Sequence, residues 1–138
     1  RIELLGPNDR NRLPIFSFRV RDGQGGFVHH QLITRLLSDR YGIQARGGCA
    51  CAGPFVHRLL GIDQAESARL RRAILSGREI EKPGFVRLNL SPLMSDEKVQ
   101  MILESVIELA LQAPDLAHLY RCDSASAIFV PVPRIALV

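Results

Sequence analysis

The residues best suited to chemistry lie in a segment of small side chains at positions 46–54, Arg-Gly-Gly-Cys-Ala-Cys-Ala-Gly-Pro. If this segment is extended, Cys49 and Cys51 point to the same side, because side chains alternate along an extended chain. Arg46 lies close enough in the sequence to favour the thiolate, the nucleophilic form of cysteine. A nucleophilic thiol is one interpretation of this segment. The other, which composition alone favours, is that one or both cysteines are small buried hydrophobic residues.

The same segment offers a second chemistry, because Cys49, Cys51 and His57 together would supply three soft ligands for a metal ion. The sequence has no second cysteine pair at zinc-site spacing, and Cys122 is expected to be incidental. We therefore predict no metal site, and keep a thiol-relay or metal-binding module as the alternative function.

Arg87 is the second candidate, because it stands in the middle of a run that is typical of a strand, residues 85–90. A partly buried guanidinium needs an anionic partner, since its burial is otherwise unfavourable. That partner is either a carboxylate of this chain or the carboxylate of a ligand, which the planar fork of arginine binds better than lysine does. The histidines give weaker signals: His29 and His30 begin a predicted helix as polar first-turn residues.

Hydrophobic periodicity and capping residues predict the elements that position these side chains. Strands are expected at residues 13–20, 43–46 and 85–90, and helices at 29–41, 55–61, 64–76 and from 95 to Pro114, which ends or kinks the last helix. Prolines in the tail predict an edge strand or a loosely packed extension. The predicted fold class is α+β: a small, largely antiparallel sheet of three to four strands, covered on one face by helices.

Composition limits the classes of protein. A length of 138 residues with 46% hydrophobic and 23% charged side chains is typical of one globular domain, without an apolar run long enough for a membrane span. The net charge of +4 comes from scattered arginines, so we expect no nucleic-acid partner. Three cysteines do not suit a secreted disulfide framework, which favours the cytoplasm. The chain starts without Met or a signal-peptide pattern, so we expect a piece of a longer protein.

The motif Arg46-x-Gly48-x-x-Cys51-Ala52-x-Pro54, followed by Val86-Arg87-Leu88-Asn89-Leu90-Ser91 and a helix with an acidic first turn, resembles a known family. It is similar to the C-terminal small domain of class V aminotransferase-like, pyridoxal-phosphate-dependent enzymes, and in its motifs most similar to group II cysteine desulfurases and selenocysteine lyases. The resemblance covers about residues 13–111. It implies the small domain of a fold-type I enzyme for residues 1–120, with 121–138 as an extended tail or edge strand.

The resemblance also implies roles for single residues. In that family the loop cysteine accepts sulfur as a persulfide, and the strand arginine holds the α-carboxylate of the substrate. By position, Cys51 would be the catalytic residue, and Arg87 and Arg46 would bind the substrate. Apart from the resemblance, we keep Cys49, His29 and His57 as candidates for accessory roles. This chain departs from the family in two ways. The family usually has histidines just before its cysteine, where this chain has Cys49 and Ala50, and the stretch between the cysteine and the strand arginine is longer here than in typical desulfurases. Aminotransferase, epimerase, elimination or lyase chemistry therefore stays open.

Pyridoxal phosphate is the cofactor that the resemblance implies for the full-length enzyme, a transferase or lyase. Such an enzyme needs a lysine that binds the cofactor covalently. The only lysines are Lys82, before a Pro-Gly turn, and Lys98, in the first turn of a helix, and neither suits that role. We expect a missing large domain of the same chain to bind the cofactor, and the fragment alone to bind none and to be inactive. The other implied partners are an amino-acid substrate, a second copy in a homodimer and a sulfur-acceptor protein.

Overall fold

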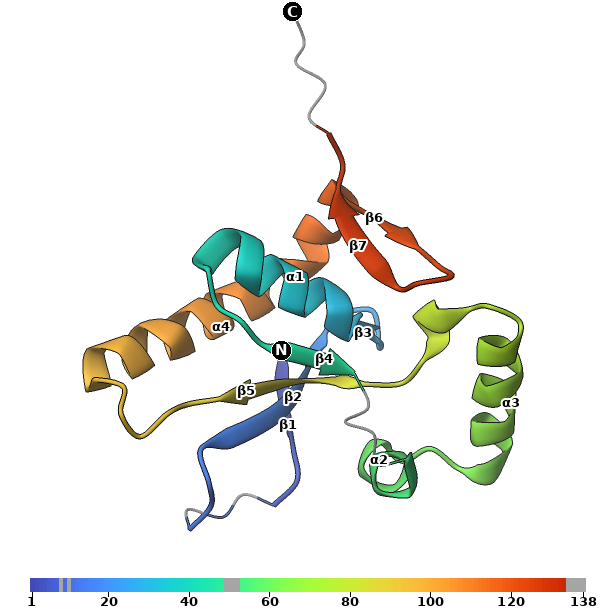
Figure 1. The fold of residues 1–138 in the computed structure, drawn as a ribbon, viewed down its shortest axis with the longest axis horizontal. Coiled ribbons are helices and arrows are strands. Elements are labelled where there is room, and N and C mark those ends of the chain that lie inside the picture. The colour runs from blue at the N-terminus through green and yellow to red at the C-terminus, as the bar shows by residue number, and fades with distance from the viewer. Residues whose placement is uncertain (8, 10, 49–52, 134–138) are drawn as a thin grey trace, which may run out of the picture.

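In the computed structural model, which describes residues 1–7, 9, 11–48 and 53–133, an antiparallel sheet of five strands forms the centre of the chain (Figure 1). Its strands are β1 (Ile2–Leu5), β2 (Ile15–Arg21), β3 (Phe27–Val28), β4 (Arg46–Gly48) and β5 (Phe85–Asn89). They are ordered β1-β2-β5-β4, and β3 pairs with the end of β2. The predicted α+β class is confirmed, with one strand more than the three to four expected.

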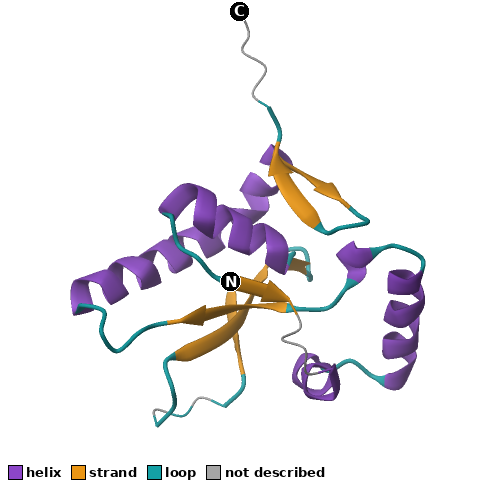
Figure 2. Cartoon of the chain, in the orientation of Figure 1, coloured by secondary structure: helices purple, strands orange, loops and turns teal. Residues whose placement is uncertain are grey.

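Helices connect and cover these strands (Figure 2). They are α1 (His30–Tyr41), α2 (Gly53–Leu60), α3 (Gln64–Leu75) and α4 (Asp96–Leu116), with the short 3₁₀ helices η1 (Glu79–Glu81) and η2 (Ala117–Leu119). The chain then forms a separate hairpin from β6 (Tyr120–Asp123) and β7 (Ile128–Pro131). The tail is thus a hairpin of its own rather than an edge strand of the main sheet.

Capping residues set the ends of the helices, and the sequence predicts two of them, Ser95 and Gly42. Ser95 accepts a hydrogen bond from the backbone N–H of Lys98 at 3.3 Å and starts α4. Asp63 does the same for Glu66 at 2.8 Å and starts α3. At the end of α1, Gly42 takes the left-handed conformation (φ 65°) that allows its N–H to reach the last carbonyls. Pro114 does not end α4, which continues for two residues beyond it.

Two strand assignments differ from the sequence prediction. The strand expected at residues 43–46 begins only at Arg46, because the N–H of Ile43 donates to the carbonyl of Leu37 at 3.1 Å and so belongs to the end of α1. The side chain of Ile43 is buried in the main core although the residue does not belong to a strand. Strand β1 was not predicted; it is four residues long and pairs with β2.

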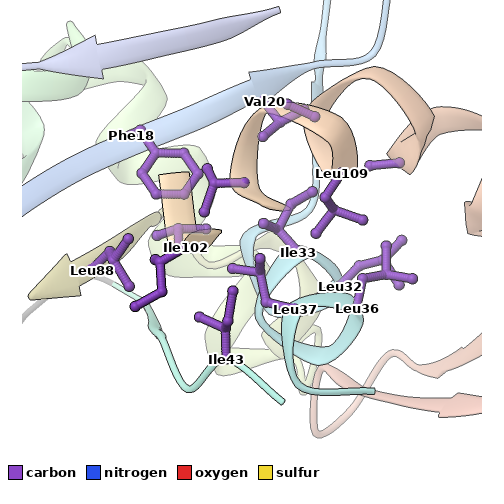
Figure 3. Packing of buried hydrophobic residues seen from close by; sticks show 14 residues of the cluster. Phe18, Val20, Leu32, Ile33, Leu36, Leu37, Ile43, Leu88, Ile102 and Leu109 are labelled. Atoms are coloured by element: carbon purple, nitrogen blue, oxygen red, sulfur yellow. The ribbon is translucent and has the colours of Figure 1, made fainter. Parts of the chain in front are cut away.

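The main core lies between one face of the sheet and the helices α1 and α4 (Figure 3). Phe18 and Val20 of β2 and Leu88 of β5 meet Leu37 of α1 and Leu109 of α4 there. A smaller cluster lies on the other face, where Val56 of α2 packs with Leu5 and Phe85. Helices therefore contact both faces of the sheet, although helices were expected on one face only.

Within the described residues no helix combines the length and hydrophobicity that crossing a membrane requires.

Candidate anion-binding site

Arg46 and Arg87 stand directly opposite each other on the neighbouring strands β4 and β5. Residues that are directly opposite in an antiparallel pair share one face of the sheet, so the two guanidinium groups leave from the same side. Val86 and Leu88, which alternate with Arg87, point into the main core. Like charges placed opposite each other are unfavourable, and among the described residues neither arginine has an ion-pair partner.

The Nε atom of Arg87 is buried and has no hydrogen-bond partner in the described part of the chain. Leaving a buried donor unsatisfied costs about 1–3 kcal/mol, and more for a charged group. Arg19, another half-buried arginine of this sheet, is satisfied instead: it pairs with Glu3 and lies over the ring of Phe27 at 3.8 Å. Arg87 is therefore the arginine whose surroundings fit an external anion.

A cavity of about 390 Å³ opens beside the two arginines. This volume lies within the usual range of pockets for small molecules. Besides Arg46 and Arg87, its charged lining consists of Lys82 and Glu79, whose Nζ and Oε2 atoms are 3.6 Å apart. The remaining wall comes from β4 and β5, from the start of α1 and from the turn between β6 and β7, through Gly47, Gly48, Phe85, His30, Gln31, Ser126 and Ala127.

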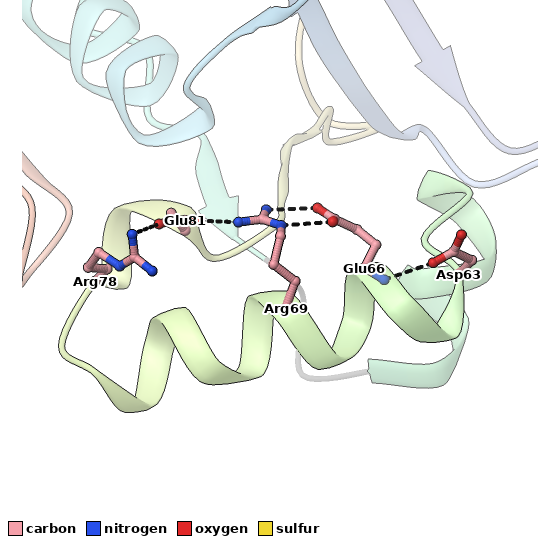
Figure 4. Close-up of polar contacts among 5 residues, drawn as sticks. All are labelled: Asp63, Glu66, Arg69, Arg78 and Glu81. Atoms are coloured by element: carbon pink, nitrogen blue, oxygen red, sulfur yellow. Dashed lines mark hydrogen bonds and ion pairs between the residues drawn. The ribbon is translucent and has the colours of Figure 1, made fainter.

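Ion pairs hold η1, which brings Glu79 to the cavity, against α3 (Figure 4). Arg69 of α3 binds both oxygens of Glu66, at 2.8 Å each, and reaches across to Glu81 of η1. Arg78 completes the network with a contact of 2.9 Å to Glu81. These side chains are largely solvent-exposed, so their contribution is to orient η1 and not to add much stability.

His29 has a structural role at the start of α1. Its Nδ1 accepts a hydrogen bond from the N–H of Gln31 at 3.2 Å, which leaves Nε2 to donate to the carbonyl of Ile80 at 3.1 Å. Both ring nitrogens are thus engaged by the backbone in the neutral form. Burial lowers the pKa of His29, in agreement with that form. It does not line the arginine cavity, so the structure gives no support to an accessory role.

His30 lines the cavity instead, and its position was not foreseen from the sequence. Its ring fits between Gly47 and Gly84: a Cβ atom on Gly84 would lie 2.7 Å from Cε1, and one on Gly47 would lie 3.2 Å from Cδ2. Burial, with a further effect of the stacked His29 ring, lowers the pKa of His30 to about 4. The imidazole is neutral at physiological pH and adds no charge to the cavity. Two adjacent histidines in the sequence do not indicate that one of them packs between two distant glycines.

Of the remaining predicted site residues, those that the structure describes do not line the cavity. Cys49 and Cys51 lie outside the described residues. His57 is on α2 and does not line the cavity. Cys122 is exposed on β6, and partial burial and the Asp123 charge raise the pKa of its thiol. Within the described ranges, no group of three His, Cys, Asp or Glu residues is arranged to hold a metal ion.

The turn between β6 and β7 completes one side of the cavity. Several contacts attach the hairpin: the N–H of Ile80 donates to the carbonyl of Ser124 at 3.1 Å, the hydroxyl of Tyr120 donates to Oδ2 of Asp39 in α1 at 2.9 Å, and the ring of Phe129 lies 5.3 Å from that of His29. Ser126 and Ala127, at the tip, reach the cavity from there.

No protein-family model matches this chain, and no curated protein matches it. The arrangement of the site is therefore the main basis for a function.

Proposed function

We propose that this chain binds the α-carboxylate of an amino acid through Arg87 and Arg46, as the small domain of a pyridoxal-phosphate-dependent enzyme of the class V aminotransferase-like type. The observation that carries the proposal is that Arg87 and Arg46 lie opposite each other at the wall of one cavity, with no ion-pair partner for either among the described residues. The sequence motif around Arg46 and Arg87 supports the same assignment.

A carboxylate in this cavity would accept two parallel hydrogen bonds from the guanidinium of Arg87 through its terminal nitrogens, because the buried Nε is closed to a ligand. Such a bidentate contact fixes the orientation of the substrate. Arg46, opposite in register, adds a second positive charge. His30 stays neutral beside them, so that it does not add to the repulsion between the two arginines.

The cofactor is assigned to another part of the enzyme. Lys98 is exposed in the first turn of α4, and Lys82 is half-exposed and paired with Glu79, so neither fits a buried lysine that attaches a cofactor covalently. When bound, pyridoxal phosphate supplies stabilisation of negative charge at the α-carbon of the substrate. The part of the site proposed for this chain is the binding and orientation of the substrate.

The finer proposal is desulfuration of cysteine, with Cys51 as the sulfur acceptor. Cys51 follows Gly48, a lining residue of the cavity, by three positions in the sequence. Its thiolate would attack the substrate sulfur; the new S–S bond forms as the C–S bond breaks, and the electron pair left on carbon takes up a proton to give alanine. Transamination, epimerisation or lyase chemistry would use the same arginines without Cys51. A thiol or metal-binding module remains the alternative outside this enzyme class.

Binding of L-alanine, followed by nuclear magnetic resonance on the 138-residue chain, tests the carboxylate site. We expect shifts confined to β4, β5 and the start of α1, and an affinity about tenfold weaker or worse in Arg87→Ala. Arg71→Ala, which removes an exposed arginine of α3, is the matched control and should bind as the wild type does. Equal affinity of Arg87→Ala and wild type would contradict the proposal.

Two further measurements test the enzyme assignment. Borohydride treatment of the isolated chain with pyridoxal phosphate should trap no cofactor, and specific labelling of Lys82 would contradict the assignment of the cofactor to another domain. In the enzyme that contains both domains, Cys51→Ser should stop sulfide release from cysteine and leave cofactor absorbance unchanged. Cys122→Ser is the control. Sulfide release that persists in Cys51→Ser would remove the desulfurase proposal, and stoichiometric zinc would favour the metal-binding alternative.

A further inference from the structure

We infer that the arginine cavity takes an amino acid with a second anionic group on its side chain, of the size of aspartate or glutamate. This inference rests on the proposed carboxylate-binding function at Arg87. It assigns Arg46 to a second anionic group instead of the α-carboxylate, and it names a substrate class that would take the place of cysteine. The second anion would lie on Arg46 while the α-carboxylate lies on Arg87.

The first argument is the balance of charge around the cavity. Of its charged lining residues, Glu79 is the one carboxylate among those described, and it is paired with Lys82. The charges of Arg46 and Arg87 are left without a counter-ion within the described residues. A ligand with a single carboxylate offsets one of these two charges, whereas an acidic amino acid offsets both.

The second argument is the register of the strands. Directly opposed residues in an antiparallel pair have Cβ atoms roughly 5 Å apart, so the two guanidinium groups start side by side on one face. A bidentate contact uses both oxygens of a carboxylate on one guanidinium. The second guanidinium is then best satisfied by a separate anionic group, and a cavity of about 390 Å³ has room for a four- or five-carbon ligand that carries both.

The third argument concerns the neutral part of the wall. His30 and Gln31 from α1 supply uncharged polar groups, which can hydrogen-bond to a ligand without repelling its second anion. The hydroxyl of Ser126, also in the wall, donates instead to Oδ2 of Asp123 at 2.8 Å. The ring of His30 is held between two glycines, so this polar wall is preformed and does not need to rearrange. The cavity thus combines two cations without a counter-ion among the described residues, the paired Lys82 and Glu79, and uncharged polar groups of α1.

Pairs of amino acids that differ in one charge test the inference. The affinities of L-aspartate and L-asparagine, and of L-glutamate and L-glutamine, are measured by titration of the 138-residue chain at constant ionic strength. We expect at least one acid to bind about tenfold tighter than its amide. Arg46→Gln, which keeps a polar side chain and removes the charge, should abolish that preference while both members still bind. Arg71→Ala should leave it intact.

The outcomes separate this inference from the proposed function. If each acid and its amide bind equally well, and Arg87→Ala weakens the binding of both, the carboxylate site stands but the site for a second anion is refuted. This result is expected if both arginines bind one carboxylate. An acid preference that survives in Arg46→Gln would also overturn the inference. If none of the amino acids binds, or if Arg87→Ala has no effect on any of them, the proposed function fails together with the inference. Spectra of the variants with wild-type dispersion establish that each is folded.

Discussion

Acid should destabilise this chain through His30, and the sign follows from the state of its ring. In the folded chain the pKa of His30 is about 4, because burial and the neighbouring His29 disfavour the charged form, against an ordinary value of 6.5. Between these two values the unfolded state binds a proton that the folded state does not. The free energy of unfolding therefore falls as the pH drops through this window, and this contribution is fully present above pH 6.5.

The difference between the two pKa values sets how much free energy of unfolding is lost in acid. One pKa unit corresponds to 1.36 kcal/mol, so the window from 6.5 down to about 4 corresponds to about 3 kcal/mol when it is crossed completely. At about pH 4.5 most of this loss, roughly 2–3 kcal/mol, should be present. That is a large share of the stability of a small domain, which is typically about 5–15 kcal/mol.

Urea unfolding of the wild type and of His30→Gln, at about pH 7 and about pH 4.5, isolates this contribution. Carboxylates titrate in the same range in both proteins, so only the difference between them reports on His30. The wild type should lose roughly 2–3 kcal/mol more than the variant does. His118→Gln, which removes an exposed imidazole of η2, is the control. The same loss in wild type and His30→Gln, or a resonance of the His30 ring that titrates near pH 6.5, would refute the reasoning.

Two other predictions concern packing. Leu37→Ala removes a fully buried side chain between α1 and the sheet and should lower the free energy of unfolding by about 3 kcal/mol, whereas Leu93→Ala, at a side chain that is 95% exposed, should have little effect in the same urea titration. Gly84→Ala should cost about 1–3 kcal/mol and shift the His30 resonances, because its Cβ would lie 2.7 Å from that ring. Gly53→Ala, where a Cβ meets open space, is the matched control; equal effects at both glycines would contradict the tight fit around His30.

The sequence predicts the elements well where a local signal exists. The helices α1, α3 and α4 begin within a residue or so of their expected positions, and α1 ends at the expected Tyr41. Ser95 as an N-cap residue and Gly42 as a C-cap residue act over a few neighbours and so give local signals. The mid-strand position of Arg87 was predicted from the pattern of residues 85–90, which is also local. Strand β1 was missed because its pairing with β2 depends on residues that are distant in the sequence: Glu3 of β1 forms ion pairs with Arg19 and Arg21 of β2. The four residues of β1 alone do not indicate this pairing.

The candidate site was predictable only in part. Arg46 and Arg87 were both expected to bind the substrate, but their direct opposition depends on the register of β4 and β5, which no local pattern specifies. The fit of His30 between two glycines requires the turn before β5 to approach the start of α1. The family resemblance, the cofactor and the role of Cys51 stay predictions.

The attachment of the β6–β7 hairpin to η1 and α1 has a consequence for the order in which the protein is made. The wall of the arginine cavity draws on residues from His30 to Ala127, so segments almost a hundred positions apart must meet before it closes. Chains emerge from the ribosome N-terminal end first, and contacts between distant segments form slowly. The sheet and α1 can assemble while the hairpin is still inside the ribosome, but the binding cavity becomes complete only when synthesis of this region is nearly finished. A nascent chain that stops before the hairpin would therefore hold both arginines without the finished site.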